Sequence, residues 1–539
     1  MAERESFRNS MRGLHTWSGL VFGWVLYFMF ITGATGYFDL EVDRWMKPEI
    51  PFVGADVEQS EMLAVAEARL NEIAPDAVNW EIAFPAGRRS QLQISWETPA
   101  EEGSNAKPIK GKEFLDPKTG TPYEIRDTAG GNKLYAMHYA FHYLPRFYTY
   151  KIASLVAFFM LIALITGVVI HRQFFKDLFT FRPGLKASSW LSAHTMLSVL
   201  TLPYLLMITY SGLVFLVFRT MPFVIAAGYS FEEDSVNKIR ADVFPRTVIE
   251  AADGVKSPIV DLGEVLREAQ PLLNGSDATA IEIVNRGSSN SRVEIGRYHH
   301  VGVMSKKLFF FDGVTGEFQS EKIAREETTK GGMIIYRILT ALHEGQFAGP
   351  FLRWIYFVSA LAGAGVVASG MILWVSKRRK KAEKADEGLV GLRLVEYLNI
   401  GTIAGLPIGI SAYFWANRML PLEMKNRGDW ELNVLFIVWA IAMTYPVAVS
   451  RTRSIRQAWK DLFFLGAIAY GVLPVLNGLT GGVHLGESIV KGDWVIAGFD
   501  LAAIVFALLF GYAALRGSEG SEHSAAIMPG GPLIERESS

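Results

Sequence analysis

Eight runs of about 20 apolar residues constrain this 539-residue chain more than any other feature of its sequence. A helix of that length crosses the ~30 Å hydrocarbon core of a bilayer. We therefore predict an α-helical polytopic membrane protein with about eight transmembrane helices. The runs lie near residues 17–38, 147–170, 191–218, 351–375, 395–415, 431–449, 462–480 and 494–515.

Basic residues occur in loops at every second boundary of these runs, which predicts the orientation of the chain. Short loops rich in Lys and Arg stay on the cytoplasmic side of a membrane. The pattern therefore predicts that both termini are cytoplasmic and that two long polar segments, 39–146 and 219–350, lie on the outer face. The basic residues are Arg4, Arg8, Arg12, Arg172, Lys176, Arg182, Lys186, Lys377, Arg378, Arg379, Lys380, Lys381, Arg451, Arg453, Arg456 and Lys460.

The two outer segments resemble each other in sequence. Each has an amphipathic stretch (62–73 and 262–273), followed by alternation typical of strands, as in 92–96 and 292–295. Each then has a turn with the pattern Asp-x-x-Thr-Gly, and Asp and Gly are typical of tight turns. We therefore predict two small α+β domains.

The repeat continues into the membrane segments. His15 precedes Gly33 by 18 residues, and His194 precedes Gly212 by the same 18. Helix, outer domain and helix therefore occur twice, and the last four helices are an addition. The predicted boundaries are 1–38, 39–146, 147–218, 219–350, 351–389, 390–515 as a four-helix membrane bundle, and 516–539 as a disordered tail rich in Gly, Ser and Glu.

Charge and cysteine content exclude several classes of function. The formal net charge is −1, and a nucleic-acid partner needs a basic surface, so none is expected. The chain has no cysteine, which excludes disulfides, thiolate-bound iron–sulfur clusters and thiol catalysis. Any redox or metal chemistry must therefore use histidines, carboxylates or a bound cofactor.

Six of the ten histidines fall at the ends of the first four predicted helices. A neutral imidazole is a good axial ligand for haem iron, and ionisable groups at the rim of membrane helices are usually functional. Two groups of three histidines therefore predict two b-type haems, each held by two imidazoles. The inner ends carry His15, His171 and His194, and the outer ends carry His138, His142 and His343.

The repeat favours particular pairs. His15 and His194 are equivalent positions, so we predict that they hold the inner haem. His171 is a rival, although its repeat counterpart is Trp374, which gives it no symmetric partner.

For the outer haem the repeat favours His343 with His142, or with His138 one turn earlier on the same helix face. The ordinary alternative for any single histidine at a membrane surface is a headgroup contact or a structural hydrogen bond.

Two further groups of residues have competing interpretations. Gly33, Gly167, Gly212 and Gly370 would make room for a porphyrin or would simply allow close helix packing. Arg146, Arg219 and Arg353 near the outer rim would pair with haem propionates or an anionic substrate, or would extend to the headgroups as long cationic side chains do.

Several strings in the first ~380 residues resemble the PepSY-associated transmembrane proteins of bacterial inner membranes. The most specific are Ile170–Pro183 and Leu352–Phe357. Shorter matches are His15-Thr-Trp-Ser-Gly19, Phe141-His-Tyr143, Trp190-Leu-Ser-Ala-His194, Leu342-His343 and Gly370-Met-Ile-Leu-Trp374.

The resemblance implies that the outer domains are periplasmic PepSY modules, each a helix packed on a small antiparallel sheet. It also implies a role in siderophore-iron uptake, in which a haem-binding reductase delivers an electron to ferric siderophore. By position, His15, His142, His194 and His343 would be the leading haem ligands, with His138 and His171 as alternates. Residues 390–515 depart from the shorter members of the family.

The expected partners are membrane lipid, a ferric siderophore or another periplasmic ferric substrate, and a quinol or a separate cytoplasmic reductase as electron donor. No nucleotide-binding or flavin-binding motif occurs in the short cytoplasmic loops. Two alternatives remain, a siderophore or iron transporter and a non-enzymatic PepSY-type regulator of an envelope protein. The repeat halves have the same orientation and the candidate sites are at the rims, which disfavours a transporter.

Overall fold

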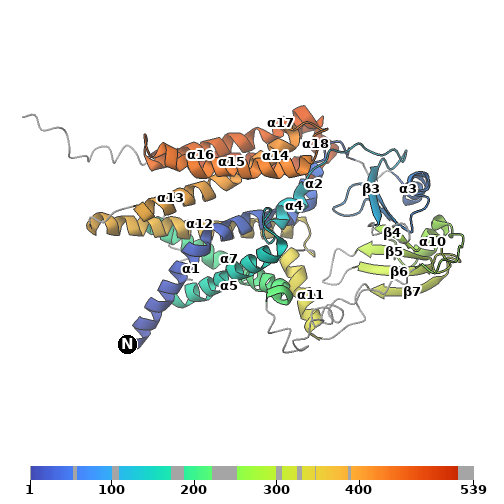
Figure 1. Cartoon of the computed structure of the whole chain (residues 1–539), viewed down its shortest axis with the longest axis horizontal. Helices are drawn as coiled ribbons and strands as arrows, with labels where there is room; N and C mark the ends of the chain where they lie inside the picture. Colours follow the sequence, from blue (N-terminus) through green and yellow to red (C-terminus); the bar gives the residue numbers. More distant parts are fainter. Residues whose placement is uncertain are drawn as a thin grey trace, which may run out of the picture. The chain divides into compact units, whose positions relative to one another are not determined.

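The computed structural model describes residues 2–52, 57–99, 108–171, 187–220, 252–298, 306–323, 331–345, 347–385 and 390–519 (Figure 1). Within these ranges, eight helical stretches are long and apolar enough to cross a membrane. Each predicted run overlaps one of them, so the predicted polytopic α-helical architecture is confirmed. The stretches are Ser6–Trp45, Arg146–Ile170, Ser188–Val217, Pro350–Ala382, Gly391–Met419, Arg427–Val449, Ile455–Gly481 and Trp494–Arg516.

Four long helices form the membrane part of the repeat, and shorter helices lie between them. The long ones are α1 (Ala2–Thr35), α5 (Arg146–Ile170), α7 (Ala187–Thr220) and α12 (Pro350–Ala385). The shorter ones are η1 (Gly36–Phe38), α2 (Asp39–Trp45), α4 (Gly130–Ala136) and α11 (Gly331–Glu344).

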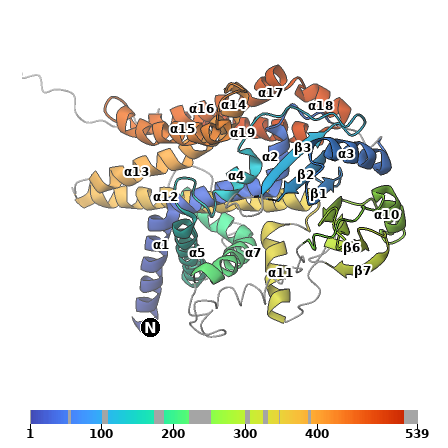
Figure 2. The same ribbon diagram turned by 45° about the vertical axis from the view of Figure 1, so that its right-hand side comes forward.

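Two of the last four predicted spans are each divided into two helices. Pro407 and Pro474 explain the breaks, because a proline lacks the N–H that would bond to the carbonyl four residues earlier. The C-terminal helices, orange to red in Figure 2, are α13 (Val390–Ile403), α14 (Gly405–Met419), α15 (Arg427–Val449), α16 (Ile455–Gly471), α17 (Leu473–Gly481), α18 (Leu485–Lys491) and α19 (Trp494–Glu519). Most of the predicted disordered tail lies outside the described residues.

The C-terminal helices bury a charged pair together with their apolar core. Arg427 and Glu431, one turn apart at the start of α15, form an ion pair at 2.5 Å, and both are fully buried. The side-chain amide of Asn417 also donates to Glu431. A buried charge needs such partners, because its loss of hydration is otherwise uncompensated.

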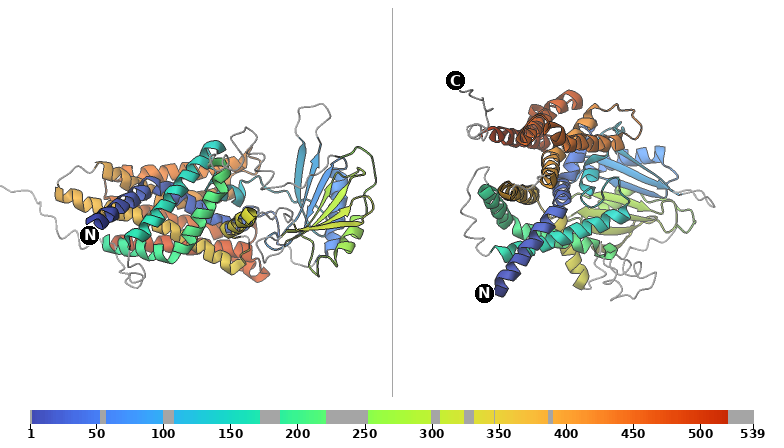
Figure 3. Two further views of the ribbon diagram at one scale, coloured as in Figure 1. Left: turned by 90° about the horizontal axis from the view of Figure 1, so that it is seen from below. Right: turned by 60° about the vertical axis from the view of Figure 1, so that its left-hand side comes forward.

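The two outer segments form one continuous antiparallel sheet instead of two separate ones. The strand order is β3-β2-β1-β4-β5-β6-β7, and Ile82 of β1 faces Ile281 of β4 at the junction. Figure 3 shows the blue strands of the first segment beside the green and yellow strands of the second. The strands are β1 (Asn79–Ala83), β2 (Leu92–Thr98), β3 (Ile109–Leu115), β4 (Ala280–Val284), β5 (Arg292–Tyr298), β6 (Lys306–Asp312) and β7 (Phe318–Ile323).

One face of this sheet holds the apolar core of the outer region. Alternate residues of the strands point to this face, as the period of two in a strand requires. Two helices, α3 (Gln59–Ile73) and α10 (Leu262–Ala269), pack their buried residues against it. The predicted amphipathic stretches 62–73 and 262–273 therefore match helices that share one core.

The two Asp-x-x-Thr-Gly turns adopt the same structure, which supports the internal repeat. Asp116 accepts backbone N–H bonds from the residues two and three positions later, and Asp312 does the same. Gly120 and Gly316 close the turns at φ +72° and +78°, a conformation that favours glycine.

The described chain divides into two compact units. One consists of residues 1–31, 165–201 and 362–539, and the other of residues 32–164 and 202–361. Each of α1, α5, α7 and α12 contributes residues to both units.

Candidate functional site

The first unit brings His15 of α1 together with His194 of α7. Their ring centres are 6.2 Å apart, and the ring planes are inclined at 75°. This is the pair that the sequence repeat favours for the inner site. The rival His171 follows α5, and its backbone N–H donates to the carbonyl of Gly167.

The second unit brings His138 together with His343 of α11. Their ring centres are 6.4 Å apart, and the ring planes are inclined at only 25°. His138 lies in the turn that follows α4, so it does not share a helix face with His142 as the sequence analysis expected. The ring of His142 lies instead against that of Tyr143, with centres 4.6 Å apart. The geometry therefore favours His138 as the partner of His343.

Four repeat-related glycines lie against these four rings. A Cβ at Gly167, Gly212 or Gly370 would lie 3.2–3.3 Å from an imidazole atom, which is tighter than an ordinary contact, whereas at Gly33 it would make an ordinary contact at 3.6 Å. Three of the glycines therefore serve close approach of a histidine, which is more specific than helix packing in general. The pairs are Gly33 with His138, Gly167 with His15, Gly212 with His343, and Gly370 with His194.

Every one of the four rings has a partner at Nδ1. Metal-binding histidines typically use one nitrogen for the metal and donate the other N–H to an oxygen. The same arrangement here places Nδ1 against an oxygen, as in a histidine that binds a metal through Nε2. The contacts are His15 to Thr166 Oγ1 at 3.4 Å, His194 to the Val366 carbonyl at 2.9 Å, His138 to the Tyr135 carbonyl at 2.6 Å, and His343 to Ser211 Oγ at 2.8 Å.

The separation of the rings fits a metal ion held between two imidazoles. A metal–imidazole bond is about 2.0 Å long, and a ring nitrogen lies about 1.1 Å from the ring centre, so two opposite ligands place their ring centres roughly 6.2 Å apart. Among the described residues no group of three or more His, Asp or Glu side chains could hold a metal ion. Two imidazoles are the number of axial ligands that a six-coordinate haem takes from a protein.

The outer pair is held in the neutral form that ligation requires. Burial lowers the pKa of His138 from 6.5 to about 4. Burial, with a further contribution from the neighbouring His138, lowers the pKa of His343 to about 3. Both rings are therefore uncharged at neutral pH, and one nitrogen of each ring keeps a lone pair with no proton to compete with a metal.

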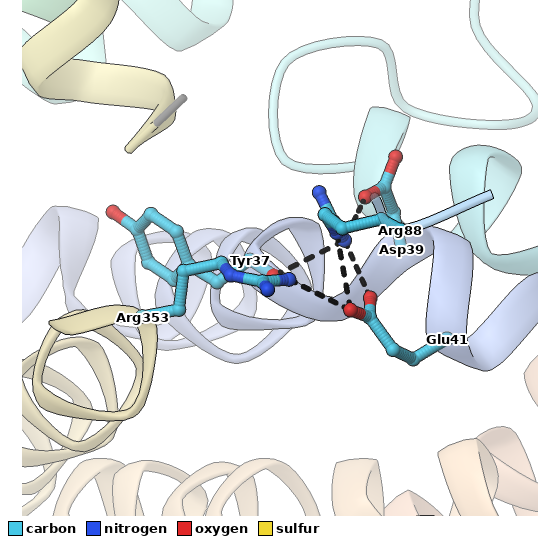
Figure 4. A network of polar contacts seen from close by, with 5 residues as sticks. All are labelled: Tyr37, Asp39, Glu41, Arg88 and Arg353. Atoms are coloured by element: carbon cyan, nitrogen blue, oxygen red, sulfur yellow. Dashed lines mark hydrogen bonds and ion pairs between the residues drawn. The ribbon is translucent and has the colours of Figure 1, made fainter. Parts of the chain in front are cut away.

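The charge of Arg353 is engaged in an ion-pair network within the second unit (Figure 4). Its guanidinium donates to Glu41 at 2.7 Å, and Arg88, from the loop between β1 and β2, pairs with Glu41 and with Asp39 at 3.0 Å. Arg88 also donates to the backbone carbonyl of Tyr37. The side chain of Arg219 lies outside the described residues, and the backbone carbonyl of Arg146 accepts from Thr149.

Tyr37 connects this network to the candidate ligand His343. Its hydroxyl lies 2.9 Å from that of Tyr204 and donates to the backbone carbonyl of His343 at 3.3 Å. Neither Tyr37 nor Glu41 is among the residues predicted from the sequence. Tyr37 lies at the end of the first apolar run, and Glu41 follows it. The position of Glu41 was a signal, since carboxylates at a membrane rim are costly unless paired.

The fold and the paired histidines define a multi-pass membrane protein with two internally repeated imidazole pairs. The profile of the PepSY-associated TM region family matches residues 12–377, and the chain belongs to this family. The matched part contains both histidine pairs and the whole outer sheet, whereas the C-terminal helices α13 to α19 lie beyond it. No curated protein matches the chain significantly.

Proposed function

We propose that this protein is a haem-containing reductase of the bacterial inner membrane. It would carry two b-type haems and pass electrons to ferric, siderophore-bound iron at the periplasmic face. The observation that supports the proposal most directly is the spacing of the two histidine pairs. The ring centres are 6.2 Å apart in one pair and 6.4 Å apart in the other.

The residues of the chain have defined roles in this proposal. His15 and His194 would ligate at one centre, and His138 and His343 at the other. The adjoining glycines leave space for the rings, and the Nδ1 partners fix the ring orientation. Haem iron supplies reversible one-electron transfer when bound at such a pair.

The chemistry of iron explains why one electron would be useful outside. Ferric ion is held tightly by hard oxygen ligands, and ferrous ion binds them more weakly, so reduction loosens the ion from its chelator. A quinol or a cytoplasmic reductase would supply the electrons. The basic loops support cytoplasmic termini, and the sheet would then lie in the periplasm.

The direct test is an absorbance spectrum of the full chain purified in mild detergent. We expect two haems per chain, and dithionite should produce the sharp α and β bands of six-coordinate b haem. The reduced protein should then convert a ferric siderophore to ferrous iron, trapped by a ferrous-specific chelator. Protein that remains colourless after haem-supplemented expression would contradict the proposal and leave transport or regulation as the function.

The ring-plane angles predict that the two centres differ in their electron paramagnetic resonance spectra. In low-spin ferric haem, nearly perpendicular imidazole planes give a more anisotropic signal than nearly parallel planes do. We expect one strongly anisotropic signal from the 75° pair and one ordinary rhombic signal from the 25° pair. Two identical signals would show that the ring planes do not keep these angles in the loaded protein.

A further inference from the structure

A hydroxyl residue precedes each of the four glycines that face a histidine. The dipeptides are Thr32-Gly33, Thr166-Gly167, Ser211-Gly212 and Ser369-Gly370. They lie on four different helices, and three of the four hydroxyls are within 3.4 Å of an imidazole Nδ1. The position before the glycine is therefore used repeatedly to contact the ring that the glycine admits.

At the outer pair the direction of the hydrogen bond can be deduced. Ser211 Oγ lies 2.6 Å from the carbonyl of Met207, which only accepts, so the single hydroxyl proton is donated there. The oxygen of Ser211 must then accept from His343 Nδ1, at 2.8 Å. The proton of the neutral ring is therefore on Nδ1.

The other nitrogen of the ring keeps its lone pair. A methyl group at Gly212 would lie 3.2 Å from Cε1 and 3.9 Å from Nδ1 of His343, so the Nδ1–Cε1 side of the ring lies against α7. Because the proton is on Nδ1, the lone pair of the neutral ring is on Nε2.

The equivalent site in the other pair relies on a backbone carbonyl instead. His194 Nδ1 is 2.9 Å from the carbonyl of Val366 and 3.3 Å from Ser369 Oγ. A carbonyl oxygen can only accept a hydrogen bond, so the Val366 carbonyl keeps the proton on Nδ1 of His194 without help from the hydroxyl. The carbonyl is also closer to Nδ1 than the Ser369 hydroxyl is. We therefore expect Ser211 to matter more for its histidine than Ser369 does.

We propose that Ser211 is a positioning residue that holds His343 in the Nδ1–H tautomer and so presents Nε2 as a ligand atom. The tautomer assignment stands on the hydrogen bonds alone, and its consequence for the outer haem rests on the proposed function. An N–H donated to an oxygen also increases the basicity of the opposite nitrogen, which strengthens it as a ligand.

The test compares the full chain with four variants in detergent. Ser211→Ala removes the hydroxyl, and Ser211→Thr restores it with a residue that the chain itself uses before Gly33 and Gly167. Ser369→Ala removes the equivalent serine, where the carbonyl remains. Thr209→Val is the control, since Thr209 is a buried hydroxyl of the same helix that donates to the Leu205 carbonyl.

The first measurement needs no haem. In haem-free protein labelled with ¹⁵N-histidine, the shifts of the two ring nitrogens distinguish the tautomers, and the difference from a His343→Ala spectrum identifies the His343 signals. We expect the Nδ1–H form in the parent chain, in Ser211→Thr and in Thr209→Val. Ser211→Ala should show a mixture of both tautomers. An unchanged tautomer in Ser211→Ala would overturn the inference.

The second measurement separates this inference from the proposed function. In haem-loaded protein, Ser211→Ala should weaken haem binding at the outer centre by roughly 10-fold or more, as loss of the oxygen partner of a metal-binding histidine usually does. Ser369→Ala should weaken the inner centre less. If no variant binds haem but the tautomer shifts as described, the proposed function fails and the role of Ser211 stands. If both haems bind equally in all variants, the inference fails and the proposed function stands.

Discussion

Replacing His343 with alanine is expected to halve the haem content of the purified protein. Its imidazole is one of two at the outer pair, and a single remaining ring at His138 cannot hold a six-coordinate iron. The inner pair lies in the other compact unit and should keep its haem. Haem quantification and the electron paramagnetic resonance spectrum measure both effects, because only the rhombic signal should disappear.

The matched control is His142→Ala, four residues from His138 on the same outer segment. The ring of His142 lies against Tyr143, and we expect that variant to retain both haems. A retained inner haem in His343→Ala also demonstrates that the chain is folded. If His142→Ala loses a haem while His138→Ala does not, the assignment of the outer ligands is wrong.

Replacing Glu41 with glutamine is expected to destabilise the protein by about 2 kcal/mol. Glu41 pairs with both Arg88 and Arg353, whose side chains are only 29% and 11% exposed. Breaking a fully buried pair costs roughly 3–5 kcal/mol, and partial exposure to solvent reduces this value. Arg353 would then face a neutral amide, whereas Arg88 would keep its pairing with Asp39. The midpoint of unfolding by denaturant, followed by tryptophan fluorescence, measures the change.

The control for this variant is Glu72→Gln. Glu72 pairs with Arg69 at 2.9 Å, but its side chain is 69% exposed, so we expect a loss of no more than about 0.5 kcal/mol. Equal losses in the two variants would indicate that the Glu41 network contributes no more than an ordinary surface ion pair.

The outer histidine pair marks the limit of inference from the sequence. His343 precedes Gly370 by 27 residues, whereas His138 precedes Gly167 by 29 and His142 by 25. The repeat therefore fits either histidine equally well. The structure distinguishes them because the chain leaves helix α4 at Met137, and the ring of His138 then lies near His343 whereas that of His142 lies against Tyr143.

Other features depended on contacts between distant segments. The pairing of β1 with β4 joins residues about 200 positions apart, and no local pattern specifies it. The hydrogen bond of Arg353 to Glu41 likewise spans 312 positions. The sequence suggested Arg353 as a partner for a haem propionate, and the structure shows it in an ion-pair network instead. Neither the pairing nor the ion pair has a signature within a short window of sequence.

The sequence by itself determined the eight membrane stretches, the internal repeat, the two identical turns and the pairing of His15 with His194. Each of these features follows from the length of an apolar run, from the period of the apolar residues, or from equal spacing in two segments. Such properties can be found within one segment or by comparing two segments of the sequence. Only the tertiary structure decided that His138 faces His343, that three of the four repeated glycines make room for a histidine ring, and that one sheet unites both outer segments. Those outcomes depend on the directions of side chains and strand edges in space, which the order of residues along the chain does not specify.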